Sequence, residues 1–187
     1  MTHPPATEIA SLPPELVHEP LNWLFAEHYR HRQLCKIIEH IARSEAFDAD
    51  RIVAALRFLR QDMPLHVRDE EEDLFPLMRR RAQPDDDLER ILGDLGADHH
   101  ADAERVQFLI EGLEAALNRK TAPASDAGLR PLLLIFVAHE RRHVALENAI
   151  VLPIARLRLT PEDLRALSRR LAARRGVQLP EDGPQIL

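Results

Sequence analysis

Residues 66–76 read HVRDEEEDLFP, and residues 143–153 read HVALENAIVLP. Each stretch has a Glu four residues after a His, and each has a Pro six residues after that Glu. The two units superpose with a single offset of 77 residues. About one His–Glu pair at this spacing is expected by chance in a chain this rich in His and acids, but two copies with a matching Pro are far rarer. The repetition indicates an internal duplication with a shared function.

Apolar residues recur around these units at three- and four-residue spacing, which predicts helices. We expect long helices over residues 20–43, 51–81, 85–118 and 129–157, and a short helix from residue 161 to Gly176. Thr160, Pro161 and Asp163 are a start signal for the short helix. Interior prolines such as Pro64 and Pro76 should kink a long helix without ending it.

Four long helices joined by short loops are typical of an up-down-up-down four-helix bundle, followed here by a short fifth C-terminal helix. The predicted class is all-α, because no segment alternates with period two for long enough to form a strand. We expect an extended arm over residues 1–19, the bundle over residues 20–160, and the short helix and tail over residues 161–187.

The composition is that of a globular protein, with 45% hydrophobic and 30% charged residues. The net charge of −6 argues against a nucleic-acid partner, and the basic clusters at 79–81 and 169–175 are expected to be solvated helix ends. The first residues lack a basic n-region and an apolar h-region, and no apolar run reaches membrane-spanning length, so we expect no export, no membrane association and a cytoplasmic location. Cys35 is the single cysteine and is expected to be a buried small hydrophobe.

The two His–Glu units have the side chains of a metal-binding site. A His and a Glu four residues apart share one helix face, about 6 Å apart, and can point at the same metal pair. A duplication should supply a further ligand from the other helix of each half. On the third helix His99 lies in phase with the apolar stripe, whereas His100 lies in phase with polar residues. On the first helix both His28 and His31 are possible, and pseudo-symmetry with His99 favours His28.

The predicted metal ligands are therefore His28, His66, Glu70, His99, His143 and Glu147. Imidazole suits iron, zinc and related metals, and a carboxylate can bridge two cations. If Glu70 and Glu147 both bridge, each metal keeps an open position, as chemistry with dioxygen, peroxide or nitric oxide requires. Ligands in the middle of long helices should make the site buried and rigid, with few routes for anything but small molecules.

With these residues the chain resembles the hemerythrin family in its HHE cation-binding form. The resemblance covers roughly residues 20–160 and also rests on the stretches AEHYRHRQLCKIIEHIA, ADHHADAERVQFLIEGL and RRHVALENAIVLPIARL. It implies a four-helix bundle with a non-haem di-iron site, that is, two iron ions with an oxo or hydroxo bridge. The family's ligands fall on the same six residues, with zinc or manganese as alternative metals.

The chain departs from the oxygen-carrying hemerythrins at two places. Those proteins have an additional His where Ala103 stands, and an Asp pattern where Glu147 stands. This weakens the interpretation as a reversible oxygen carrier and favours relatives that act in iron handling, redox sensing or repair. His139 is either a spare ligand or, as we prefer, a supporting or surface residue.

Among the acids after His66, Glu71 is expected to hydrogen-bond a ligand histidine. Asp69, Glu72 and Asp73 are expected to form a solvated face. Three functions stay open: a di-iron protein that binds or reduces a small molecule, a non-enzymatic iron store, donor or sensor that acts through a partner, and a zinc-bound or metal-free structural bundle.

Overall fold

A computed structural model of the chain describes residues 8–179. Within these residues every regular element is helical, so the predicted all-α class is confirmed. The α-helices are α1 (Pro20–Arg43), α2 (Ala49–Arg57), α3 (Met63–Asp69), α4 (Phe75–Arg81), α5 (Leu88–Arg119), α6 (Leu129–Leu146), α7 (Leu152–Arg158) and α8 (Pro161–Arg175). Short 3-10 turns occur at η1 (Pro14–His18), η4 (Pro84–Asp86) and η5 (Pro123–Ser125).

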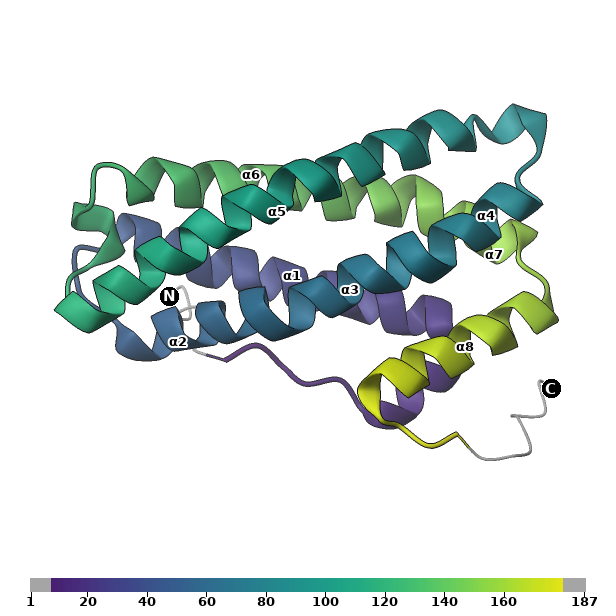
Figure 1. Cartoon of the computed structure of the whole chain (residues 1–187), viewed down its shortest axis with the longest axis horizontal. Coiled ribbons are helices and arrows are strands. Elements are labelled where there is room, and N and C mark those ends of the chain that lie inside the picture. Colours follow the sequence, from purple (N-terminus) through teal and green to yellow (C-terminus); the bar gives the residue numbers. More distant parts are fainter. Residues whose placement is uncertain (1–7, 180–187) are drawn as a thin grey trace, which may run out of the picture.

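The long helices lie side by side and alternate in direction (Figure 1). Helices α1 and α5 run one way along the molecule, while the α2–α4 segment and the α6–α7 segment run the other way. Helix α8 folds back against the beginning of α1 and against the α3–α4 segment. The segment before α1 was expected to be extended, and it contains the turn η1. Part of that arm and most of the tail lie outside the described residues.

Each interior proline of a long helical segment follows a π-helical turn. These turns are η2 (Phe58–Asp62), η3 (Glu70–Leu74) and η6 (Glu147–Val151), and they come shortly before Pro64, Pro76 and Pro153. A proline has no N–H, and its ring clashes with the carbonyl four residues back, so a wider turn accommodates it. The segments therefore stay continuous, as predicted, and two of the three π turns begin at Glu70 and Glu147.

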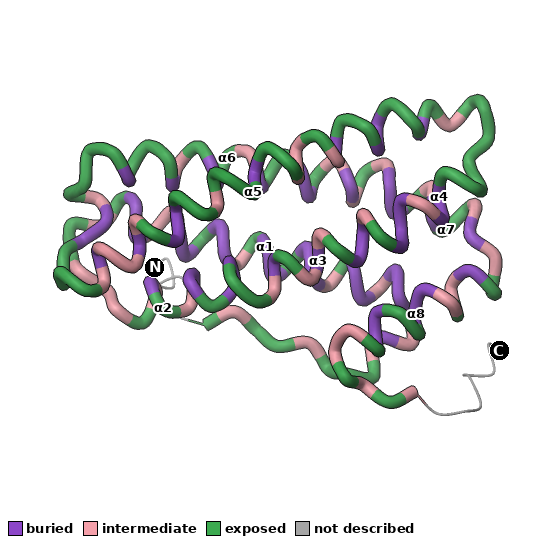
Figure 2. The backbone as a smooth tube through the Cα atoms, in the orientation of Figure 1, coloured by how far each residue is buried: buried purple, intermediate pink, exposed green. Residues whose placement is uncertain are grey.

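The apolar interior is split into two clusters, one toward each end of the bundle. On α1, Leu24 belongs to the cluster that contacts α8, and Leu34 belongs to the cluster beside α2. Buried polar residues, among them His28 and His31, lie between these two positions. Figure 2 shows that the buried positions face inward along every long helix. The polar site therefore lies mid-bundle, with packed apolar side chains on both sides of it.

Cys35 is fully buried, and burial raises the pKa of its thiol to about 12, so this side chain stays protonated and packs as a hydrophobe. In the described part of the chain no helix is both long enough and apolar enough to cross a bilayer.

The start of α8 gives a prediction about pH. The Thr160 hydroxyl accepts the backbone N–H of Asp163, and Asp163 in turn accepts from the backbone N–H of Thr160 and from Arg81. The hydrogen bond from Arg81, together with those from Thr160, lowers the pKa of Asp163 from 3.8 to about 2. A carboxylate with a depressed pKa in the folded state stabilises the fold above its unfolded pKa, and this stabilisation is lost as the pH falls from about 4 to about 2.

Asp163→Asn is therefore expected to cost about 1 kcal/mol of unfolding free energy at pH 6. The cost should shrink to less than half of this value at pH 2, where about half of the wild-type carboxylates are protonated. Urea unfolding at the two pH values measures both. An equal cost at both pH values would contradict this account.

Candidate metal centre

The six predicted ligands come from four different helical segments and meet in the middle of the bundle. His28 lies on α1, His66 in the middle of α3 and His99 on α5, while His143 lies near the end of α6. Glu70 and Glu147 open the π turns η3 and η6. All are buried except His99, which is nearly so, with 8% of its side chain exposed. The structure therefore brings together every residue that the sequence analysis selected.

The six side chains form two groups that share both carboxylates. One group is His28, His66, Glu70 and Glu147, and the other is Glu70, His99, His143 and Glu147. Within each group the candidate ligand atoms all lie within 4.8 Å of one another. Two clusters of two imidazoles with two common carboxylates have the donor set of a pair of cations.

The imidazole Nε2 atoms point at the carboxylates. The Nε2 atom of His28 lies 3.6 Å from Glu70 Oε1 and 3.3 Å from Glu147 Oε2. In the second group, Nε2 of His99 lies 3.4 Å from Glu70 Oε2, and Nε2 of His143 lies 3.0 Å from Glu147 Oε1. Glu70 thus faces histidines of both groups.

Several of these inward-facing atoms lack hydrogen bonds. Both oxygens of Glu70 and of Glu147, together with Nε2 of His28 and of His66, are buried without a hydrogen-bond partner among residues 8–179. Burying such groups unpaired costs several kcal/mol, and carboxylates cost more than neutral groups. Metal ions bound between them would satisfy these atoms at once, so the residues present fit a pair of cations.

The outward Nδ1 atoms of the same rings are held by other side chains. The Nδ1–H of His28 donates to Asn148 Oδ1 at 2.8 Å, and that of His99 donates to Glu71 Oε1 at 2.7 Å. The Nδ1–H of His66 donates to Glu27 Oε2 at 3.2 Å. A proton fixed on Nδ1 leaves the Nε2 lone pair directed inward, which is the arrangement that metal-binding histidines use.

The carboxylates make the centre strongly attractive to positive charge. Burial disfavours protonated His66, but the charge of Glu70 and the hydrogen bond to Glu27 raise its pKa to about 10. Burial likewise disfavours protonated His143, but the Glu147 carboxylate, whose Oε1 lies 3.0 Å from its Nε2, raises that pKa to about 9. Burial works against ionised Glu70, yet the neighbouring histidines lower its pKa. The site therefore keeps positive charge, whether as protons or as metal ions.

The other histidines lie outside both groups. His31 is buried, and its Nδ1–H donates to Glu140 Oε1 at 2.5 Å. The Nδ1 atom of His139 lies 2.9 Å from Asp102 Oδ2, so its ring pairs with an acid on α5. His100 is exposed. Of the histidines left open in the sequence, His31 thus lies beside the candidate centre and His139 at its margin.

A cavity of about 510 Å³ opens onto the candidate centre between the α2–α3 side and α5. Its apolar wall includes Leu59, Met63, Val67, Ala103, Val106 and Ile110. His31, Glu140 and three of the candidate ligands, His66, His99 and His143, also line it. The cavity therefore gives small molecules a route to ligands that lie buried in the middle of their helical segments.

The acidic run after His66 is only partly as expected. Glu71 does hydrogen-bond a candidate ligand, which confirms that prediction, and Glu72 is half exposed. Asp69 and Asp73 are buried rather than solvated, so the expected solvated face is wrong for these two residues. They pair with α8, where Arg174 donates to Asp69 at 2.7 Å and Arg170 donates to Asp73 at 2.6 Å. The basic cluster near the C-terminus is thus largely ion-paired, not solvated.

Sequence reasoning missed Glu27, Asn148, Asp98 and Glu140. A signal was present for three of them, because they adjoin predicted ligands at matching places in the two halves. Glu27 precedes His28 as Asp98 precedes His99, and Asn148 follows Glu147 as Glu71 follows Glu70. Glu140 had no such signal, since its partner His31 lies 109 residues away.

His66→Ala is expected to lose most of the bound metal, because it removes the inward nitrogen of one group. His100→Ala changes an exposed histidine next to a candidate ligand and should leave the metal bound. The metal content of the two purified variants, measured by mass spectrometry, is compared with that of the wild type. Full metal retention in His66→Ala would overturn the ligand assignment.

The comparison with known protein families identifies a cation-binding family. The family model described as "Hemerythrin HHE cation binding domain" matches residues 19–155, which include all six predicted ligands. No curated protein and no solved structure matches the chain.

Proposed function

The chain belongs to the hemerythrin family, with its cation-binding HHE domain over residues 19–155, and we propose that its buried His and Glu residues hold two iron ions. We propose further that this centre binds or reduces dioxygen, peroxide or nitric oxide, in iron or redox homeostasis or a stress response in the cytoplasm. The observation that carries the proposal is the convergence of two ligand groups on two common carboxylates.

A bound iron pair would supply one-electron chemistry and open coordination positions for small molecules. The protein's own residues would do the rest. Glu70 and Glu147 offset the charge of both ions, and the Nδ1 partners Glu27, Glu71 and Asn148 fix the ring orientations. The apolar wall of the cavity offers water few hydrogen-bond partners, while His31 and Glu140 hold a proton between Nδ1 and Oε1 at its edge.

The cavity favours reaction with a small molecule over simple iron storage, because storage needs no apolar approach to the ligands. Ala103 lines this cavity four residues after His99. It stands where the oxygen-carrying hemerythrins have an additional His, so space remains beside the His99 group.

Metal analysis of protein expressed in iron-rich medium tests the proposal. We expect two irons per chain and absorption bands of a bridged ferric pair that change with azide, peroxide or nitric oxide. Protein that contains zinc instead of iron after growth in iron-rich medium would contradict the di-iron proposal. Iron that passes to an apo-acceptor without any reaction with these molecules would favour a store or donor.

A further inference from the structure

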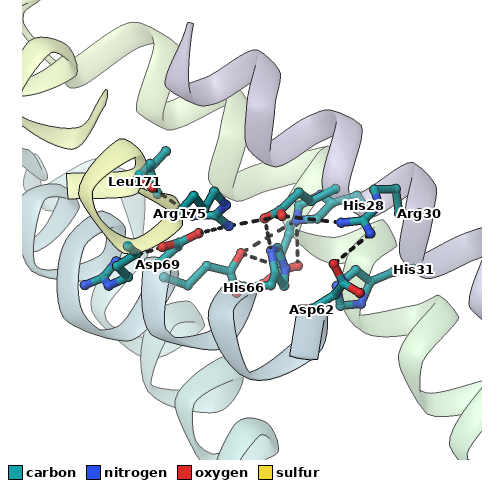
Figure 3. Close-up of polar contacts among 12 residues, drawn as sticks. His28, Arg30, His31, Asp62, His66, Asp69, Leu171 and Arg175 are labelled. Atoms are coloured by element: carbon teal, nitrogen blue, oxygen red, sulfur yellow. Dashed lines mark hydrogen bonds and ion pairs between the residues drawn. The ribbon is translucent and has the colours of Figure 1, made fainter. Parts of the chain in front are cut away.

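The C-terminal helix α8 lies beyond residues 19–155, yet it reaches the candidate metal centre through Arg175. The Nη2 atom of Arg175 donates to Glu27 Oε1 at 3.1 Å and to Asp69 Oδ2 at 2.6 Å. Glu27 uses its other oxygen, Oε2, to accept the Nδ1–H of His66. Figure 3 shows Arg175 of α8 reaching toward Asp69 and the histidine cluster.

We propose that Arg175 is a positioning residue for the metal centre. It holds Glu27, and through Glu27 it fixes the orientation of the His66 ring. The inference rests on the proposed metal-binding function but not on the identity of the metal. In this proposal α8 contributes a residue that orients a candidate ligand, although this helix lies outside the matched family domain.

The surroundings of Arg175 leave it little freedom. Its guanidinium carbon lies 4.8 Å from the ring centroid of Trp23, and its Nη1 donates to the carbonyl of Leu171 at 3.2 Å. Only 11% of the Arg175 side chain is exposed, and Glu27 and Asp69 are buried. A guanidinium fixed by stacking and by several hydrogen bonds can hold two carboxylates in one geometry, which a solvated side chain cannot do.

The other half of the centre has a different arrangement. Asp98 occupies the place that corresponds to Glu27, but its Oδ2 lies 3.8 Å from Nδ1 of His143, which is beyond hydrogen-bond length. Asp98 is also more exposed, and the basic side chains near it are His139 and Arg142. The two groups are therefore inequivalent, and the link from α8 serves the His28–His66 group.

Arg174 offers a matched control on the same helix. It also donates to Asp69, at 2.7 Å, and it is about as buried as Arg175. Within the described part of the chain it pairs with Glu72 and Asp73 rather than with Glu27. R174Q thus weakens the docking of α8 and leaves the link to His66 in place, whereas R175Q cuts that link.

The test is an anaerobic Fe²⁺ titration of the full-length wild type, R175Q and R174Q. In R175Q we expect the affinity for one of the two ions to fall about 10- to 100-fold, the usual effect of losing a partner that orients a ligand. The weakened step should be the one that His66→Ala weakens most. In R174Q both steps should stay within about twofold of wild type, since Arg174 contacts Asp69, Glu72 and Asp73 rather than Glu27 or a candidate ligand. Equal weakening in both variants, or none in R175Q, would overturn the proposal.

A second pair of measurements separates positioning from general damage. If R175Q does not fold, Glu27→Gln cuts the same link from its other end and should weaken the same step, and an unchanged step would refute the link. In Zn²⁺-loaded protein, the Nδ1–H proton resonance of His66 should shift in R175Q and stay in place in R174Q. A wild type that takes up no Fe²⁺ would count against the di-iron proposal alone, because Zn²⁺ titration of the same variants still tests the role of Arg175.

Discussion

Glu70→Ala is expected to abolish the binding of both metal ions, the largest single effect that the structure predicts. Glu70 belongs to both ligand groups, and its two oxygens face histidines of different groups. Its removal deletes one donor from each group and one of the two buried negative charges that would offset the charge of the cations. We expect the affinity to fall by more than about 100-fold, since loss of a residue that merely orients a ligand already costs 10- to 100-fold.

The matched control is Glu72→Ala, two residues further along the same segment. Glu72 is half exposed and pairs with Arg68 and Arg174, outside both ligand groups. Metal content and titration of the two variants should therefore differ sharply, with wild-type stoichiometry in Glu72→Ala. Two tightly bound ions in Glu70→Ala would show that the two groups do not depend on a common carboxylate.

Removal of the metal is expected to lower the melting temperature by roughly 10 °C. A ligand that binds only the folded state at a thousand times its Kd stabilises it by about 4 kcal/mol. One kcal/mol shifts the melting temperature of a domain of this size by about 2–4 °C. The physical source is the set of buried atoms of Glu70, Glu147, His28 and His66 that have no hydrogen-bond partner within residues 8–179.

Calorimetry of the protein before and after dialysis against a chelator measures this shift. Adding metal back should restore the original melting temperature in the wild type, whereas Glu70→Ala should melt at the same temperature with and without chelator. A wild-type melting temperature that does not respond to chelation would contradict a metal-stabilised centre.

The local elements were predictable from the sequence because their signals are local. Helix α8 begins with the Thr160 cap and Pro161 and ends at Gly176, which adopts a left-handed φ of 64° that favours glycine. The prolines inside the long helices were also visible. The π turns before them were not, because a kink and a widened turn are alternative responses to the same proline and the surrounding packing selects one.

The choice among histidines shows the limit of helical phase. His28 and His31 are both buried, so the apolar pattern of α1 could not separate them. In the folded protein the ring of His31 is turned toward Glu140, while Nε2 of His28 faces Glu70 and Glu147. These partners come from distant parts of the chain, and the distinction depends on how α1, α3 and α6 pack together.

The sequence by itself determined the helical class, the course of the long helices and the pair of His–Glu units, since periodicity, caps and spacing act within a few residues. The tertiary structure alone decided that Asp69 and Asp73 are buried ion-pair partners of α8, and that Arg175 reaches Glu27 beside His66. The physical reason is that the residue type alone does not show whether an acid is solvated or buried in an ion pair. Its burial is set by a partner some hundred residues away, which no local pattern specifies.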